Sequence, residues 1–304
     1  MKHRNNIILI FIAIFTFFGA FYFYRQIEEF YMKHGQIIPL SNEAEPVRNW
    51  KDYNLVMHAL GAIHGHVDTN TKEALIENYH RGSRVFEIDL HWTTDERLIA
   101  IHPTRVLRRI TDKETVTSYD ILHNNFFKER DLTPLTFGDL AILMVEFPDI
   151  FIITDTKNID KETVQNQFAY IYRVANEIDR RILNRIIPQL YNFDMYLYIE
   201  EIYSFKEYIL TLYQIPRIEN SSIFNFLTKH PRVTVVSLPF NSERLNLEFI
   251  QTLRAMSVLT YVHTLSNMAE ITRLYNMGVW GFYTPFITED YIRRNGLLRF
   301  NASN

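Results

Sequence analysis

The sequence predicts an α/β fold, a (β/α)8 TIM barrel with an antiparallel hairpin after its second strand, preceded by one N-terminal transmembrane helix. Three observations support this prediction. From Asp52 onward, short β-branched or aromatic runs alternate with longer amphipathic stretches, as in a parallel sheet with crossover helices. Such a region of about 250 residues has the usual length of a closed barrel. Before it, one uncharged apolar run differs from the rest of the chain.

The overall composition excludes several classes of protein. The chain has 304 residues, of which 47% are hydrophobic, and a formal net charge of −3. This balance gives no polycationic field, so we expect no nucleic-acid partner. The chain has no cysteine. Disulfides, thiolate metal sites and a cysteine nucleophile are therefore excluded, and sulfur from cysteine cannot hold a metal.

The apolar run extends from Ile7 to Tyr24. As a helix it would be ~27 Å long, near the lower limit for crossing a bilayer. Lys2 and Arg4 precede it, which favours a cytoplasmic N-terminus. We therefore expect a signal anchor over 1–25, a stalk and linker over 26–51, and a barrel over 52–304. This arrangement predicts a single-pass protein of the cell membrane with an extracytoplasmic barrel.

Two other interpretations of the apolar run stay open, a cleaved signal peptide and a buried core helix. No small-x-small cleavage motif follows the run, which argues against a signal peptide.

The barrel elements follow from the pattern of apolar residues. We expect strands at Leu55–Ala59, Arg84–Leu90, Ile150–Thr156, Arg185–Tyr191, Tyr208–Tyr213, Val233–Leu238, Val258–Thr264 and Val279–Thr284. Amphipathic patterns predict helices at Thr71–His80, Lys161–Ile178, Ile223–His230, Asn246–Met256 and Asn267–Asn276. A further strand, Arg97–His102, follows the second strand after only a few residues, which is too short for a parallel crossover. It must therefore be an antiparallel excursion that brings His102 back to the C-terminal end of strand two.

Carboxylates cluster in the second strand. Glu87 and Asp89 are separated by one residue, so both side chains point to the same face of the strand. Two carboxylates on one face repel each other unless a cation lies between them. Oxygen ligands of this kind suit one divalent cation, Mg²⁺ or Ca²⁺. The alternative is that one or both carboxylates pair with an arginine at the barrel rim.

Three other strand ends carry ionisable residues. Asp155 and Lys157 share a face, and they form either a buried ion pair or a third metal ligand beside a lysine that binds phosphate. His58 ends strand one and His102 ends the excursion. Each alone could be a structural histidine. Because the C-terminal ends of barrel strands meet at one rim, two histidines near three carboxylates indicate acid–base catalysis.

In their order, these fragments resemble the glycerophosphodiester phosphodiesterase family, which is related to the phosphatidylinositol-specific phospholipase C-like barrels. The resemblance runs from about Leu55 to Thr288. Within the family, the sequence is similar to a membrane-anchored bacterial branch whose first motif is His-Ala-Leu-Gly. The fragments that carry it are His58-Ala59-Leu60-Gly61, Thr69-Asn70-Thr71, Phe86-Glu87-Ile88-Asp89-Leu90, Leu98-Ile99-Ala100-Ile101-His102, Asp155-Thr156-Lys157 and Gly278-Val279-Trp280-Gly281-Phe282-Tyr283-Thr284.

The resemblance implies a role for each of these residues. His58 and His102 correspond to the two catalytic histidines, one of which acts as general base and the other as general acid, and Lys157 would help the metal bind the phosphate of a phosphodiester substrate. The metal ligands would be Glu87, Asp89 and Asp155. In the family, a hydroxyl next to the phosphoester commonly attacks phosphorus, and water then opens the resulting cyclic phosphate.

Several positions depart from the family pattern. Ala59 and Leu60 replace the usual arginine and glycine, Thr69 replaces a glutamate, and Pro103 and Pro285 replace aspartates. Three other functions therefore stay open. They are hydrolysis of a glycerophosphate polymer such as teichoic acid or a capsule strand, metal-independent lyase chemistry, and an inactive barrel that serves as a surface binding module.

Overall fold

The computed structural model describes residues 48–102, 118–119 and 127–295. Within these residues, eight parallel strands close into a ring, because the first strand pairs with both the second and the last. The strands are, in ring order, β1 (Leu55–Met57), β2 (Val85–Trp92), β5 (Phe151–Asp155), β6 (Ile186–Leu190), β7 (Tyr208–Thr211), β8 (Val233–Pro239), β9 (Leu259–His263) and β10 (Gly281–Thr284). Each predicted barrel strand overlaps one of these, so the predicted closed barrel is confirmed.

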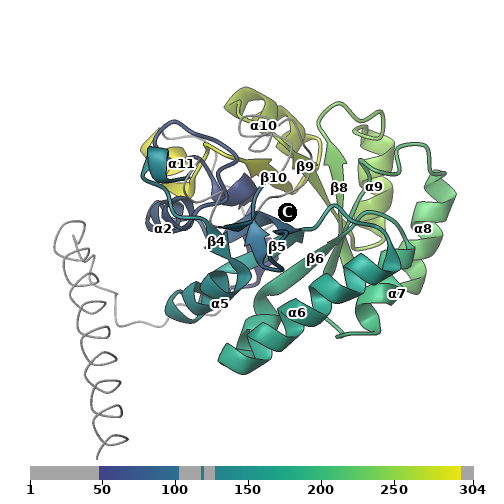
Figure 1. Cartoon of the computed structure of the whole chain (residues 1–304). Helices are drawn as coiled ribbons and strands as arrows, with labels where there is room; N and C mark the ends of the chain where they lie inside the picture. The colour runs from purple at the N-terminus through teal and green to yellow at the C-terminus, as the bar shows by residue number, and fades with distance from the viewer. Residues whose placement is uncertain (1–47, 103–117, 120–126, 296–304) are drawn as a thin grey trace, which may run out of the picture. The chain divides into compact units, whose positions relative to one another are not determined.

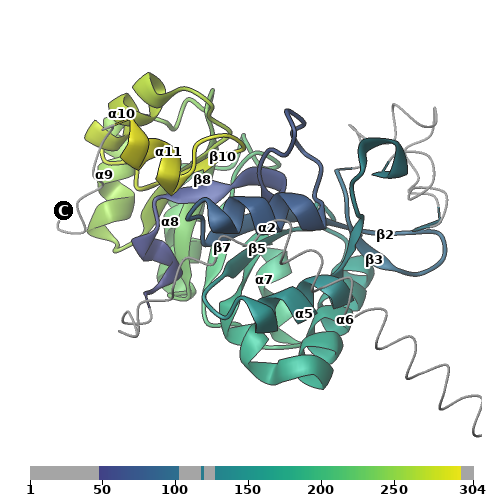
Figure 2. The same ribbon diagram turned by 90° about the vertical axis from the view of Figure 1, so that its left-hand side faces the viewer.

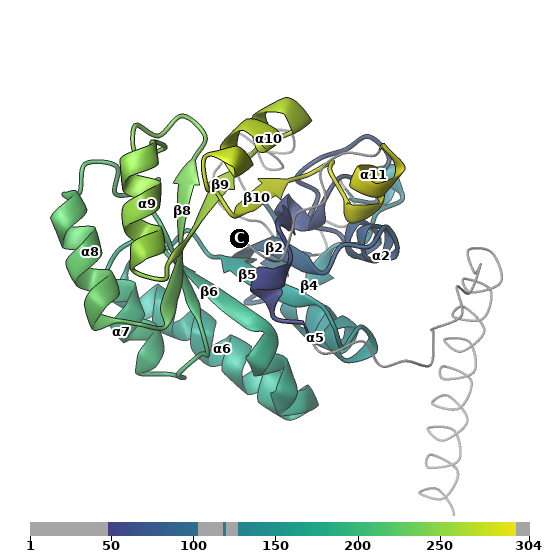
Figure 3. The same cartoon turned by 180° about the vertical axis from the view of Figure 1, so that it is seen from behind.

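Helices surround the strands, as Figures 1 and 3 show from opposite sides. They are α2 (Lys72–His80), α5 (Phe137–Glu146), α6 (Lys161–Asp179), α7 (Asp194–Glu200), α8 (Asn220–Lys229), α9 (Leu247–Ala255), α10 (Met268–Asn276) and α11 (Glu289–Arg294), with 3-10 turns at η1 (Trp50–Asp52), η2 (His58–Leu60), η4 (Lys128–Arg130) and η5 (Arg180–Arg185). The five predicted helices match α2, α6, α8, α9 and α10. A local sequence signal also marks the start of α5, where Thr136 and Asp139 form a capping box.

The predicted antiparallel excursion is confirmed. Strand β3 (Leu98–Ala100) pairs antiparallel with β2, and β4 (Leu135–Thr136) then pairs antiparallel with β3. Figure 2 shows the β2–β3 hairpin extending from one side of the barrel. After β3, the Ile101 backbone N–H donates to the Asp89 carbonyl oxygen over 2.9 Å. This bond returns the chain to the C-terminal half of β2 and sets the position of His102.

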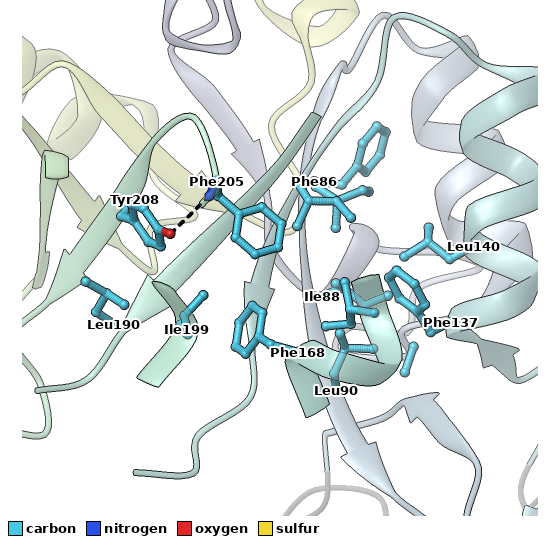
Figure 4. Close-up of a cluster of buried hydrophobic side chains, with 14 of the residues drawn as sticks. Phe86, Ile88, Leu90, Phe137, Leu140, Phe168, Leu190, Ile199, Phe205 and Tyr208 are labelled. Atoms are coloured by element: carbon cyan, nitrogen blue, oxygen red, sulfur yellow. Dashed lines mark hydrogen bonds between the residues drawn. The ribbon is translucent and has the colours of Figure 1, made fainter. Parts of the chain in front are cut away.

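The two faces of β2 have different surroundings. Phe86, Ile88 and Leu90 point outward and pack into the large apolar cluster that includes side chains of α5 and α6 (Figure 4). The alternate residues begin with Val85, which belongs to an apolar layer inside the barrel. Glu87 and Asp89 follow Val85 on this inner face, nearer the C-terminal end. An apolar layer therefore closes the barrel below the carboxylates and keeps them from water.

The structure corrects the predicted end of the first strand. β1 ends at Met57, and His58 begins the 3-10 turn η2 instead of closing a strand that reaches Ala59. Ala59 and Leu60 have φ values of +49° and +66°, a left-handed conformation that cannot continue a strand. Leu60 thus adopts a backbone conformation that glycine would adopt more easily. The Asn78 side chain stabilises the turn by donating to the carbonyl oxygen of Leu60 over 3.1 Å.

The predicted transmembrane segment and most of the predicted stalk lie outside the described residues, as does Pro103. Among the helices that are described, none has the length and apolar character needed to span a bilayer.

Candidate active site

Three carboxylates meet inside the barrel at the C-terminal end of β2 and β5. Asp89 and Asp155 are direct register partners on these two parallel strands, and Glu87 lies two residues earlier on β2. One oxygen from each of the three groups can be chosen so that all lie within 4.8 Å of one another. The residues are 2%, 0% and 8% exposed for Glu87, Asp89 and Asp155, respectively. The spacing of Glu87 and Asp89 predicts that they share a face, and the common rim of the strand ends predicts that Asp155 joins them. The structure brings the three residues together.

Glu87 is only partly satisfied by hydrogen bonds. Its Oε2 accepts from the Ala59 backbone N–H over 2.8 Å, which ties the carboxylate to the turn that carries His58. Its Oε1 is buried and has no hydrogen-bond partner among the described residues. Burial, and then repulsion by Asp89, raises the pKa of Glu87 to about 8. A buried oxygen without a donor is costly, and a cation at this point would remove the cost.

Asp89 is fixed from two sides. The Asn70 side chain donates to Asp89 Oδ2 over 2.9 Å and accepts from the Asp89 backbone N–H over 3.1 Å. Lys157 Nζ contacts the other carboxylate oxygen, Oδ1. Burial alone would raise the pKa of Asp89, but Lys157 and the two nearby histidines outweigh burial and lower it to about 2. Asp89 is therefore a carboxylate even without a metal.

Lys157 also contacts Asp155, with Nζ donating to Oδ2 over 3.0 Å. The buried ion pair that was one interpretation of Asp155 and Lys157 is thus present in the structure, and Lys157 shares it with Asp89. Burial would lower the pKa of Lys157, but Asp155 and Asp89 outweigh burial and raise it. The ammonium group supplies one positive charge to three carboxyl groups, and it hydrogen-bonds Asp89 and Asp155 but not Glu87.

Asp155 is held by a chain of buried polar side chains. The Tyr191 hydroxyl donates to Asp155 Oδ1. Gln189 Nε2 in turn donates to the Tyr191 hydroxyl over 3.4 Å, and the Tyr283 hydroxyl donates to Gln189 Oε1 over 3.2 Å. Tyr191 directly follows β6, and Tyr283 lies in β10. Their connection was not predictable, because β6 and β10 are not neighbours in the sheet.

This donor set fits a divalent cation. Mg²⁺ and Ca²⁺ prefer carboxylate oxygens, and the cluster supplies oxygens from three residues. The unpartnered Glu87 Oε1 is an independent sign that the site can take a further positive charge. Outer groups such as Asn70 and Tyr191 fix the carboxylates, as they do around metal sites in general.

Both predicted catalytic histidines lie at this cluster. His58 Nε2 is 3.9 Å from Glu87 Oε2, and its Nδ1 is 3.1 Å from Asp68 Oδ1. His102 interacts electrostatically with Asp89, Lys157 and His58. Burial lowers the pKa of His102, and the attraction of Asp89 opposes this effect. The two imidazoles can therefore act on one group bound at the carboxylates.

The sequence did not identify His263 as part of this region. It is the last residue of β9, and its ring lies edge-on to Tyr213 at 5.8 Å and to Tyr283 at 6.0 Å. It interacts electrostatically with His58, and burial lowers its pKa to about 4. Its place at the C-terminal end of a barrel strand is the one signal that could have indicated it.

The comparisons with known proteins agree with this architecture. A sequence profile of the Glycerophosphoryl diester phosphodiesterase family matches residues 53–289. A search of curated proteins finds no significant match. The fold is similar to a glycerophosphodiester phosphodiesterase from Thermotoga maritima, with a TM-score of 0.59, 15% identity, and coverage of 80% of this chain and 97% of that one.

Two further solved structures show the same fold. A glycerophosphoryl diester phosphodiesterase from Parabacteroides distasonis matches with a TM-score of 0.61 and 14% identity, covering 82% of this chain and 88% of that one. A phosphodiesterase from Oleispira antarctica, in complex with its product sn-glycerol-3-phosphate, matches with a TM-score of 0.60 and 13% identity, covering 80% and 94%. Because the family profile spans most of the chain, this protein belongs to the glycerophosphoryl diester phosphodiesterase family, whose members are phosphoric diester hydrolases.

Proposed function

We propose that this protein is a metal-dependent phosphodiesterase that hydrolyses glycerophosphodiesters or related lipid headgroups. The observation that carries the proposal is the meeting of three buried carboxylates, one lysine and two histidines at the C-terminal end of the barrel. This end of such barrels is where catalytic residues lie. The Oleispira antarctica relative has glycerol phosphate as its product, which supports a glycerophosphodiester as the substrate class.

Glu87, Asp89 and Asp155 would hold one Mg²⁺ or Ca²⁺ ion. When bound, the ion supplies Lewis acidity that offsets charge on the phosphoryl oxygens. Lys157 provides a second positive charge beside Asp89 and Asp155, where it would bind a phosphate oxygen.

His58 and His102 would move protons on either side of the phosphate. One imidazole takes the proton from a substrate hydroxyl next to the phosphoester, and this oxygen forms a new bond to phosphorus. The other imidazole gives a proton to the leaving alcohol as its P–O bond breaks. Water then opens the cyclic phosphate with the two roles exchanged.

The test is hydrolysis of glycerophosphodiesters, a chromogenic diester and a glycerophosphate polymer by the full-length protein, with and without EDTA. We expect release of glycerol phosphate from the small diesters, loss of this activity in EDTA, and recovery with Mg²⁺ or Ca²⁺. Activity that is unaffected by EDTA would overturn the role of the metal. A preference for the polymer would make a glycerophosphate polymer the substrate. Absence of hydrolysis of every diester despite metal binding would overturn the enzymatic proposal and favour a binding module.

We also propose that residues 7–24 anchor the protein in the cell membrane as a single span, with the barrel outside the cytoplasm. The support is the apolar run itself and the basic residues Lys2 and Arg4 before it. Full-length protein should stay with the membrane after alkaline carbonate extraction, and external protease should reach the barrel in intact cells. Release by carbonate, or protection of the barrel from the protease, would contradict this proposal.

A further inference from the structure

Asp68 lies against the outer nitrogen of His58. Its Oδ1 is 3.1 Å from His58 Nδ1, while the other ring nitrogen, Nε2, is 3.9 Å from Glu87 Oε2. Asp68 is only 4% exposed, so water does not screen this contact well. The His58 ring is thus placed between two carboxylates, one on the metal-site side and one behind it.

The loop that carries Asp68 also supports the metal site. Asp68 and Asn70 have φ values of +59° and +52°, and Asn70 makes the two hydrogen bonds that fix Asp89. One short loop therefore braces both a candidate catalytic base and a candidate metal ligand. Asp68 itself does not belong to the carboxylate cluster, which in the described residues consists of Glu87, Asp89 and Asp155. Asp68 therefore acts on the proposed reaction through its contact with His58.

A carboxylate at Nδ1 determines where an imidazole carries its proton. When Nδ1–H faces a carboxylate, the neutral ring has its lone pair on Nε2, which is the nitrogen that faces Glu87 here. In this structure the two atoms are within ion-pair distance, but His58 Nδ1 makes no hydrogen bond with the described residues. Such bonds are often misaligned before substrate binds and become aligned in the reacting complex.

We propose that Asp68 is the positioning residue of His58, holding the ring with Nδ1 protonated so that Nε2 is free to accept a proton from the substrate. The expected effect of Asp68 on catalysis rests on the proposed function, whereas the predicted tautomer of His58 does not. The sequence did not single out Asp68, because it lies ten positions from His58 in a loop without a recognisable pattern.

The left-handed backbone at Asp68 decides which variants test this role. Asparagine and glycine both tolerate φ near +59°, whereas alanine would add strain. Asp68→Gly removes the acceptor, and Asp68→Asn keeps an oxygen that can accept from Nδ1–H. Asp131 is a matched control, since it is an exposed aspartate with φ of +53° at the end of η4. Asp131→Gly and Asp131→Asn should leave every measurement unchanged.

Two measurements on the full-length protein are needed. Long-range ¹H–¹⁵N spectra of histidine-labelled protein, with His58 assigned by its loss in His58→Gln, report which ring nitrogen is protonated. We expect Nδ1–H in the wild type and in Asp68→Asn, and a shift toward Nε2–H in Asp68→Gly. With the preferred diester, Asp68→Gly should lower kcat about 10- to 100-fold with KM changed less than about 3-fold. Asp68→Asn should recover at least part of kcat.

An unchanged His58 tautomer in Asp68→Gly, or an Nε2–H tautomer already in the wild type, would overturn the proposal. Equal losses of kcat in Asp68→Asn and Asp68→Gly with unaltered His58 signals would do the same, because they would indicate a loop defect. Absence of any diester hydrolysis by the wild type would refute the proposed function but not the tautomer assignment, which the spectra test independently.

Discussion

Asp89 and Asp155 lie directly opposite each other on neighbouring parallel strands and share the ammonium group of Lys157. Like charges in such a pair repel, so the arrangement is stable only with a cation between or beside them. Lys157 supplies one positive charge to a cluster of three carboxylates. Glu87 receives no hydrogen bond from Lys157, and its buried Oε1 has no partner among the described residues. One lysine for three carboxyl groups, together with this unpartnered oxygen, is the physical basis of the metal proposal.

Glu87→Gln should abolish binding of Mg²⁺ or Ca²⁺ while the fold persists. The amide oxygen can still accept from the Ala59 backbone N–H, but the charge that attracts the ion is lost. Isothermal titration calorimetry measures the change, with circular dichroism as the check on folding. Glu207→Gln is the control, since Glu207 pairs with Lys51 and Trp50 away from the cluster. Full-affinity binding by Glu87→Gln would contradict the assignment.

Tyr191→Phe should weaken metal binding by ~10- to 100-fold, the usual effect of losing a group that orients a ligand. The reason is that the Tyr191 hydroxyl donates to Asp155 Oδ1. Tyr208→Phe also removes a tyrosine–carboxylate hydrogen bond, the partly buried one to Glu200, and should leave metal affinity unchanged. Isothermal titration calorimetry compares the metal affinities of the two variants, and equal affinities would exclude an orienting role for Tyr191.

His58→Ala and His102→Ala should each lower kcat by ~10²- to 10⁴-fold, the range for loss of a general acid or base. Metal affinity should change little, because neither imidazole belongs to the carboxylate cluster. Steady-state kinetics on the preferred diester measure the effect. His80→Ala, at the exposed end of α2, is the control. Survival of wild-type activity in either site variant would refute the acid–base assignment.

Lys157→Met should lower the free energy of unfolding by ~3–5 kcal/mol in EDTA, because it leaves Asp89 and Asp155 buried without their cation. Mg²⁺ or Ca²⁺ should restore part of the loss. Denaturant unfolding with and without metal measures both effects. Lys161→Met removes an exposed pair with Glu201 and should leave the free energy of unfolding almost unchanged, independent of metal. A stability loss that metal does not reduce would contradict the shared site.

His263→Gln should make the protein less sensitive to acid. The pKa of His263 is about 4 in the folded protein against an ordinary 6.5, because burial disfavours the charged ring. Because the pKa of His263 is lower in the folded state than in the unfolded state, its neutral ring contributes stability that is fully present above pH 6.5. This stability is lost as the pH falls through 4. The loss is at most roughly 3 kcal/mol. Urea unfolding at pH 7 and pH 4 measures it, and an unchanged pH dependence in the variant would disprove the contribution.

Much of the fold was predictable because it depends on local patterns. Short β-branched and aromatic runs located the strands, and the short connection before Arg97 required an antiparallel hairpin, as β3 confirms. Because alternate residues of a strand point to the same side, the sequence placed Glu87 and Asp89 on one face of β2. The short helices α7 and α11 were harder to locate, because seven and six residues span too few turns to show a clear apolar period.

The sequence alone determined the barrel, the family, and the convergence of Glu87, Asp89, Asp155, Lys157, His58 and His102 at one rim. Apolar patterning and the order of strands and helices predict the barrel and its rim, whereas the family follows from sequence motifs and the profile match over residues 53–289. Only the tertiary structure decided that Lys157 bridges Asp89 and Asp155, that Tyr191 holds Asp155, and that Asp68 lies behind His58. These contacts depend on side-chain orientation across separate strands and on left-handed turns after β1, which no residue pattern specifies.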